Sequence, residues 1–443
     1  MKYVEQIKSL LLTFLVLLSI VFTLLIWNYK PEYETIKETQ VEEVLVGQPK
    51  ELQEVLKPYR LLYRQNGHFH GTVSSDVLEE FYSHLRTWEI YELDLIKSKV
   101  PDNRMNEMLR KDSRVSMFFN EEIPLQIFSN LLSFNDNEIP EASFTRLIID
   151  WSNVEKSDQL QLLFLNTEKR LLYRAYASVP DKGYFMEKVI EPANDYSQYV
   201  EVERDALRSL YVPKDPIQSA TYKYLTEDIK PDLFKKILFT DIKIVQRNIE
   251  SAQSERFTDG TSLMTVDTQN RIINYVYPPA ESIAPISSSR LLIDSFNYIN
   301  DHGGFTMDYR LSSMNIGKHI TDYQLFVHGL PVHSNVTTTH LVTTWGENRL
   351  FRYRRPYYSM GTRIDRVQRD LESGTQIIES LRAKDNELFK EAEEIVVGYQ
   401  LTLEKSEQDT DVIVLEPSWF AVTNSEMTRL SPEQIGRVEV GLE

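Results

Sequence analysis

The feature that most constrains the fold of this chain is an apolar stretch close to its N-terminus. From Leu10 to Trp27 the sequence is LLLTFLVLLSIVFTLLIW, and no charged residue occurs between Ser9 and Tyr29. As a helix this stretch is about 30 Å long, the thickness of the hydrocarbon core of a bilayer. A cleaved signal peptide would have a shorter apolar region followed by a site of small residues, which is missing after Trp27. We therefore predict an uncleaved transmembrane helix over residues 10–29.

The flanks of this helix indicate its orientation. Residues 1–9 are too few to fold, so we predict a cytosolic head there. Lys2 and Lys8 precede the helix, whereas Lys30 and Lys37 after it are accompanied by several glutamates, which is a slight positive-inside bias. We expect a single-pass protein of the cell membrane with a cytoplasmic N-terminus and an extracytoplasmic ectodomain.

Charge and composition exclude several classes of function. The formal net charge is −17, so the surface repels nucleic acid and anionic lipid head groups. The chain has no cysteine, which excludes disulfides, thiolate catalysis and cysteine-ligated metals. With 42% hydrophobic and 26% charged residues, the composition is typical of a globular protein rather than a disordered one.

Changes in composition divide the predicted ectodomain. A stretch rich in glutamate follows the apolar helix, and a passage rich in proline and aspartate, from Val212 to Asp232, indicates a junction near 205–231. The predicted parts are a polar tether over 30–54, an N-terminal ectodomain over 55–205, a central α+β domain over 231–364 and a C-terminal α+β domain over 365–443.

Local patterns predict both helices and antiparallel hairpins, which together indicate an α+β fold. A helix after Ser75 would place Val77, Phe81, Leu85 and Trp88 on one face. Two further helices are expected, one capped by Ser289 and ending at Gly303-Gly304, the other capped by Ser373. The predicted hairpins pair 160–165 with 170–179, 262–266 with 271–278 and 340–345 with 349–354, and strands are expected at 396–403 and 411–415.

A search for catalytic and metal-binding motifs gives none. The sequence has no G-x-S-x-G elbow, Walker loop, H-E-x-x-H helix or calcium loop. His68 and His70 are two residues apart, and His328, His333 and His340 flank a Gly-Leu-Pro segment, but neither set has a convincing further ligand. We interpret these histidines as turn residues and predict no catalytic residue, no cofactor and no metal.

Paired acids occur at Glu121-Glu122, at Glu393-Glu394 and at Asp409 and Asp411. Their polar surroundings favour solvated surface positions. Whether two of these acids form a catalytic pair of the glycosidase type is left undecided, because the sequence does not give the separation between the carboxyl groups.

The segment Arg352-Tyr353-Arg354-Arg355 is a candidate partner contact. Arginine and tyrosine are favoured at the centres of protein interfaces, and the segment is basic on an acidic chain. The alternative is a strand end with tyrosine directed inward and arginine outward.

Six segments of the second half resemble the YycH family, whose members are also called WalH. They are KPDLFKKILFTD (230–241), ERFTDGTSLMTVD (255–267), RIINYVYP (271–278), HGLPVHSN (328–335), YRRP (353–356) and LEPSWF (415–420). The resemblance implies an anchored ectodomain followed by two smaller α+β domains similar to the sister protein YycI. It also implies association with YycI and with the sensor histidine kinase YycG (WalK), which controls cell-wall metabolism. The family offers no catalytic residues, and the sign of its effect on the kinase stays open.

Two functions of different classes therefore compete. The first is a membrane-anchored regulatory protein without enzymatic activity, which binds and modulates a sensor histidine kinase. The second is an anchored wall-facing hydrolase or ligand-binding module. The missing motifs favour the first.

Three polar residues in the apolar helix suggest a contact between helices in the membrane. An inert anchor needs only apolar residues, yet this one contains Thr13, Ser19 and Thr23. Ser19 and Thr23 are about 40° apart around a helix and share a face, so they are candidate contacts with a partner helix. The alternative is that each hydroxyl bonds to a carbonyl of its own helix.

Overall fold

The computed structural model describes residues 14–16, 18–19, 23, 46–136, 138–157, 159–406, 410–424, 426–431 and 434. The chain divides into two units, Met1–Glu43 and Val44–Glu443. Most of the predicted transmembrane helix lies outside the described residues. Within the described part of the chain, no helix combines the length and the apolarity needed to cross a bilayer.

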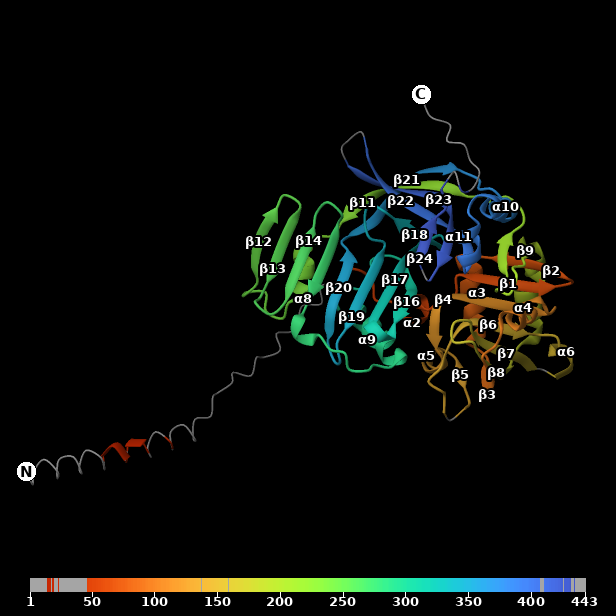
Figure 1. Ribbon diagram of the computed structural model, residues 1–443, viewed down its shortest axis with the longest axis horizontal. Coiled ribbons are helices and arrows are strands. Elements are labelled where there is room, and N and C mark those ends of the chain that lie inside the picture. Colours follow the sequence, from red (N-terminus) through yellow and green to blue (C-terminus); the bar gives the residue numbers. More distant parts are fainter. Residues whose placement is uncertain are drawn as a thin grey trace, which may run out of the picture. The chain divides into compact units, whose positions relative to one another are not determined.

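The first sheet of the second unit is built from the N-terminal half of the chain (Figure 1). Within the described residues it has ten strands in the order β10-β9-β2-β1-β4-β6-β7-β8-β3-β5. The strands are β1 (Arg60–Gln65), β2 (His68–Thr72), β3 (Glu89–Ser98), β4 (Arg114–Pro124), β5 (Ser133–Phe134), β6 (Ser143–Asp150), β7 (Gln159–Asn166), β8 (Leu171–Ser178), β9 (Ser197–Val202) and β10 (Leu210–Pro213). We call residues 46–213 the N-terminal half.

The second sheet contains all the later strands. Its described part has 14 strands, twelve of them in the order β12-β13-β14-β15-β20-β19-β17-β18-β22-β23-β11-β21, with β16 beside β17 and β24 beside β23. They are β11 (Ala220–Asp228), β12 (Gln246–Ser251), β13 (Ser254–Thr258), β14 (Leu263–Asp267), β15 (Ile272–Val276), β16 (Tyr309–Asn315), β17 (Ile320–Val327), β18 (Leu330–Ser334), β19 (His340–Trp345), β20 (Leu350–Pro356), β21 (Tyr358–Gln368), β22 (Glu394–Lys405), β23 (Asp411–Thr423) and β24 (Glu426–Arg429). We call residues 217–434 the C-terminal half.

Helices cover these sheets, so the fold is α+β as predicted. The described α-helices are α2 (Leu52–Val55), α3 (Ser75–Leu85), α4 (Asp102–Arg110), α5 (Leu125–Leu131), α6 (Val154–Ser157), α7 (Lys182–Tyr184), α8 (Pro231–Leu238), α9 (Ser288–Asp301), α10 (Gly374–Lys384) and α11 (Asn386–Glu391). A π-helical turn, η1 (Phe185–Ile190), and the 3₁₀ turns η2 (Glu191–Asp195), η3 (Pro278–Ala280) and η4 (Ile316–Lys318) complete the set.

Alternation along the first sheet separates two cores. Leu61 and Met117 point to the face covered by α3 and α5, and they belong to the large core cluster. Leu62, Phe118 and their neighbours point to the other face, where Met105 and Met108 of α4 cover them. The period of two along a strand places successive side chains on opposite faces, so this sheet is buried on both sides.

The three predicted hairpins are confirmed. β7 pairs with β8 from Gln159↔Ser178 to Asn166↔Leu171, β14 pairs with β15, and β19 pairs with β20, all antiparallel. The strands expected at 396–403 and 411–415 are the central parts of β22 and β23, which pair along their length.

One predicted helix cap is confirmed and another is wrong, and the face of a third helix is wider than predicted. Ser373 caps α10 as predicted, and it forms a capping box with Gln376. The cap of α9 is Ser287 rather than Ser289, because the Ser287 hydroxyl accepts the backbone N–H of Arg290. Of the face predicted for α3, Phe81, Leu85 and Trp88 are buried and Val77 packs partly buried against the same core, while Leu78 and Tyr82 widen this face.

Residues 46–54, the last part of the predicted tether, are folded against the C-terminal half. The backbone N–H of Gly47 donates to the carbonyl of Gly303 at 2.6 Å. Lys50 donates its backbone N–H to Asn300 at 3.0 Å, and its ammonium group is 3.1 Å from Asp308. The first residues of the N-terminal half are therefore held to the C-terminal half.

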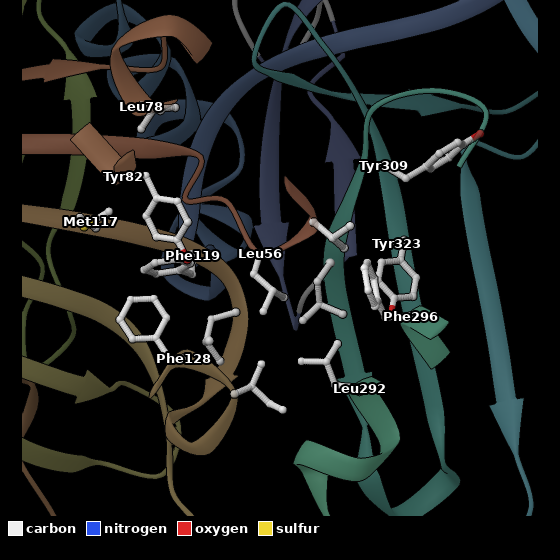
Figure 2. Packing of buried hydrophobic residues seen from close by; sticks show 14 of the residues in the cluster. Leu56, Leu78, Tyr82, Met117, Phe119, Phe128, Leu292, Phe296, Tyr309 and Tyr323 are labelled. Atoms are coloured by element: carbon white, nitrogen blue, oxygen red, sulfur yellow. The ribbon is translucent and has the colours of Figure 1, made fainter. Parts of the chain in front are cut away.

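An apolar junction joins the two halves. Figure 2 shows Leu56, just after α2, between Phe119 and Phe128 of the N-terminal half and Leu292 and Phe296 of α9. All five belong to one continuous cluster of buried side chains. The two halves therefore share a core, and we call these five residues the junction.

Candidate functional site: a cleft between the two halves

Beside the junction the two halves enclose a cleft of about 850 Å³. Its walls come from β1, β4 and β6 of the N-terminal half and from β11, β18 and β22 of the C-terminal half. Ligand pockets commonly have volumes of about 300–1,000 Å³ and lie between domains. The position and size of the cleft make it the candidate functional site.

A buried ion triad crosses the cleft. Glu394, the first residue of β22, lies 2.8 Å from Arg60 of β1 and 2.8 Å from Arg146 of β6. Both guanidinium groups pack on the ring of Phe118, at 4.1 and 4.3 Å from its centroid. Arg60 also donates to the carbonyl of Tyr211 at 3.2 Å. The triad thus links the two halves through charged side chains that are largely shielded from solvent.

Electrostatics in the triad favour its charged form. Burial alone would raise the pKa of Glu394, but the charges of Arg60 and Arg146 outweigh burial and hold that pKa below its ordinary value. The pKa of Arg60 is raised, because Glu394 overcomes the opposing effect of burial. The side chain of Arg60 is 3% exposed, so removal of Glu394 would leave a buried charge without its counterion.

Four glutamates gather at one end of the cleft, which we call the acidic end: Glu121, Glu122, Glu168 and Glu393. Two of them have basic partners. Glu122 pairs with Lys169 at 2.5 Å, and Glu168 pairs with Arg208 at 3.2 Å. The other two, Glu121 and Glu393, have no basic partner within ion-pair distance in the described part of the chain.

The two glutamates without such partners have raised pKa values. Burial is the main cause in both cases. The pKa of Glu121 is raised to about 7, although its oxygens accept the backbone N–H groups of Glu122 and, across the halves, of Met314. The pKa of Glu393 is raised by burial and then by the charge of Glu168. Burial therefore holds these two carboxyl groups in their protonated form to a higher pH than usual.

The opposite end of the cleft is aromatic and basic, and it consists of Tyr222, His328, Arg366 and Tyr399. The rings of Tyr222 and His328 lie 4.5 Å apart, and those of Tyr222 and Tyr399 lie 6.0 Å apart. The guanidinium group of Arg366 lies 5.9 Å from the Tyr222 ring. Burial lowers the pKa of His328, and the charges of Arg363 and Arg366 lower it further. We call these four residues the aromatic–basic end.

Strand β22 connects the two ends. Glu394 begins it, Ile395 to Val397 line the cleft, and Tyr399 reaches the aromatic–basic end. At about 3.3 Å per residue, the distance from Glu394 to Tyr399 along the strand is about 16 Å. On one edge this part of β22 pairs with β23, whereas β18 joins its other edge only from Tyr399 onward in the described structure.

The expectation that the paired acids are solvated surface residues is wrong for two of the three pairs. Glu121 and Glu394 are largely buried, and both pairs line the cleft. Asp411 pairs with Arg271 and Lys405, and Asp409 lies outside the described residues. The sequence does contain one indication that Glu394 is buried, because this residue precedes the alternating strand at 396–403. Its partners, Arg60 and Arg146, are more than two hundred residues away in the sequence, and no local pattern identifies them.

In the described structure the histidines of the two candidate sets lie in separate surroundings. His70 contacts the carbonyl of Tyr196, and His68 is exposed at the start of β2. His333 lies beside Gln400 at 3.2 Å, and His340 lies 2.7 Å from Asp322, whereas His328 belongs to the aromatic–basic end. No group of three or more metal-ligating side chains comes together among the described residues.

The candidate contact segment lies on β20, and it has two faces. Tyr353 and Arg355 are buried, and Arg355 lies 3.0 Å from the hydroxyl of Tyr353 and 4.6 Å from the centroid of the Phe234 ring. Arg352 and Arg354 are exposed on the other face. Two of the four residues therefore serve the core, and a contact role for Arg352 and Arg354 stays a prediction.

Of the three polar residues in the apolar helix, Thr13 lies outside the described residues. The hydroxyl of Thr23 donates to the carbonyl of Ser19 at 2.8 Å, which is the bond within the helix that the alternative requires. The contact of this face with a partner helix stays a prediction.

Comparison with known families decides the relationship of this chain. A family model described as YycH protein, C-terminal domain, matches residues 207–432, and one described as YycH protein, N-terminal domain, matches residues 5–194. The chain belongs to the YycH family.

A curated sequence and a crystal structure, both of YycH from Bacillus subtilis, extend this result. The two-component system WalR/WalK regulatory protein YycH of strain 168 is 21% identical over 444 residues, which is 97% of each chain. The crystal structure of YycH from Bacillus subtilis matches with a TM-score of 0.74 and 19% identity, and the match covers 87% of this chain and 99% of that chain. The YycH fold is therefore common to both. The resemblance expected from the six sequence segments is confirmed.

Proposed function

We propose that this chain is a membrane-anchored regulatory protein of a two-component system, and that it acts by binding a sensor histidine kinase. The single observation that carries the proposal is the match to the regulatory protein YycH along 97% of both chains. A match of that extent includes the N-terminal apolar stretch as well as both sheets.

A regulatory role without catalysis agrees with the chemistry of the cleft. The buried carboxylate of Glu394 is neutralised by two arginines. The Tyr224 hydroxyl lies 3.2 Å from Nε2 of His328, but burial raises the pKa of Tyr224 and lowers that of His328, so neither change favours proton transfer from the hydroxyl to the imidazole. A positioned acid and base are what hydrolysis requires. This arrangement favours regulation over the alternative of a wall-facing hydrolase.

The apolar stretch at 10–29 supplies the anchor in this proposal. It places the second unit outside the cytoplasm, where that unit can contact the extracytoplasmic part of a kinase of the YycG (WalK) type and a sister protein of the YycI type. The regulated output is cell-wall metabolism. These partners and this localisation follow from the family resemblance and from the apolar stretch.

The test is affinity purification of the tagged full-length chain from membranes of its native host. We expect a histidine kinase to be recovered after crosslinking in intact cells. Efficient recovery of the tagged chain without any crosslinked histidine kinase would contradict the proposal.

Variants of the apolar stretch test where the contact lies. Ser19→Leu with Thr23→Leu preserves apolarity, and we expect this pair to reduce kinase recovery severalfold. Phe14→Leu with Val21→Leu is the matched control, because Phe14 and Val21 are about 180° around a helix from the first pair. Equal recovery with both double variants would exclude the Ser19 and Thr23 face while leaving the kinase itself as a partner.

A further inference from the structure

We propose that the cleft binds a short, extended peptide with free termini, its ammonium group at the acidic end and its carboxylate at the aromatic–basic end. This inference goes beyond regulation of a kinase and does not depend on it. It is based on the charge distribution, length and open strand edge of the cleft.

The two ends of the cleft carry groups of opposite kind, carboxyl groups at one end and a guanidinium group at the other. At the acidic end, Glu121 and Glu393 lack basic partners within the described residues, and burial raises both pKa values. A bound ammonium group would lower the pKa of both carboxyl groups and pair with their ionised forms. Charge-assisted hydrogen bonds of this kind are about twice as strong as neutral ones.

At the other end, Arg366 is the anion-binding group. Its side chain is exposed, forms no ion pair among the described residues, and places the guanidinium group 5.9 Å from the centroid of the Tyr222 ring. Guanidinium groups bind carboxylates in a bidentate manner, and an aromatic ring beneath them holds their orientation. Tyr222 and His328 add ring faces against which the last side chain of a peptide can pack.

The distance between the ends sets the length of the ligand. The part of β22 from Glu394 to Tyr399 extends over about 16 Å, which equals about five residues of extended peptide at 3.3 Å each. The cleft volume of about 850 Å³ accommodates a ligand of this size.

The edge of β22 provides the backbone contacts. From Glu394 to Val397 this strand pairs with β23 on one side, and no strand of the described residues pairs with its other side; Pro331 lies against Gly398, and β18 pairs from Tyr399 onward. An extended peptide added to a free strand edge forms main-chain hydrogen bonds that do not depend on its sequence. The cleft therefore recognises termini and length rather than one particular sequence.

The first experiment uses the purified full-length chain in detergent with three probes, measured by isothermal titration calorimetry. The probes are penta-alanine with free termini, its N-acetylated form and its C-amidated form. We expect the free peptide to bind, and each capped form to bind about tenfold more weakly, because each cap removes one charge-assisted contact. No binding of the free peptide, or equal binding of all three probes, would overturn the proposal.

The second experiment assigns each end of the cleft. Arg366→Ala should weaken the free peptide about tenfold and abolish the effect of C-amidation, whereas Arg363→Ala should do neither, because Arg363 is also near Tyr222 but does not line the cleft. Glu393→Gln should abolish the effect of N-acetylation, with the exposed Glu391→Gln as its control. If a control variant weakens binding as much as its partner, or if amidation still matters in Arg366→Ala, the proposed orientation is wrong.

Discussion

The junction and the cleft both join the two halves, yet they use opposite chemistry. The junction fills its space with the apolar side chains of Leu56, Phe119, Phe128, Leu292 and Phe296. The cleft joins the same halves through the Arg60–Glu394–Arg146 triad and leaves about 850 Å³ unfilled. Apolar burial holds the halves together because it needs no particular partner geometry. The triad, by contrast, fixes geometry across a space that a ligand can enter.

The largest effect is expected from breaking the triad. Glu394→Gln removes the charge that compensates Arg60 and Arg146, and it should lower the free energy of unfolding by about 3–5 kcal/mol, since it leaves two buried cations. Urea unfolding of the purified protein measures this loss, with the exposed Glu391→Gln as the control. A loss below about 1 kcal/mol would show that water solvates the triad.

The junction should be nearly as sensitive to truncation. Leu56 is 1% exposed and lies between the halves, so Leu56→Ala should cost about 3 kcal/mol through lost burial and the cavity left behind. The control is Ile283→Ala, at a side chain that is 96% exposed. An equal effect of the two substitutions on the urea midpoint would contradict the junction as described.

Glu121 should give the stability of the protein a pH dependence. Its pKa is raised from 4.5 to about 7 in the folded protein, so the folded form keeps a proton that the unfolded form loses between these values. Stability should therefore fall as pH rises from about 4.5 to 7, by about 2 kcal/mol after allowance for partial solvent access. Urea unfolding at pH 5 and pH 8 should show this fall in the parent and a smaller one in Glu121→Gln. An identical pH dependence in both proteins would assign the effect to other groups.

The smallest effect on stability is expected at the exposed face of β20. Arg352→Ala with Arg354→Ala should change the free energy of unfolding by less than about 0.5 kcal/mol per residue, because both side chains are exposed. If these residues contact a partner, the same double variant should reduce kinase recovery in the membrane purification. Unchanged recovery would remove them from the contact surface.

Sequence patterns predicted the local structure well and the cleft hardly at all. The hairpin at 160–178 and the Ser373 cap depend on neighbouring residues, whose alternation and capping chemistry are visible in the sequence. The predicted face of α3 is buried, and it also includes Tyr82, whose polar hydroxyl gives no reason to expect it inside. Glu394 and Glu121 were interpreted as surface acids because their burial depends on Arg60, Arg146 and Met314, which only the paired halves bring close.

We propose that the junction and the triad hold the two halves together, whereas the two ends of the cleft bind the ligand on which regulation depends. The most direct test replaces the native chain in its host by the Arg366→Ala, Glu393→Gln double variant and measures transcription from promoters of the two-component system. Protein level, unfolding midpoint and kinase recovery are measured alongside, with Arg363→Ala, Glu391→Gln as the matched control. We predict parental stability and kinase recovery, with an output shifted at least halfway toward that of a strain lacking the chain. Parental output from a double variant that no longer binds penta-alanine would contradict the claim.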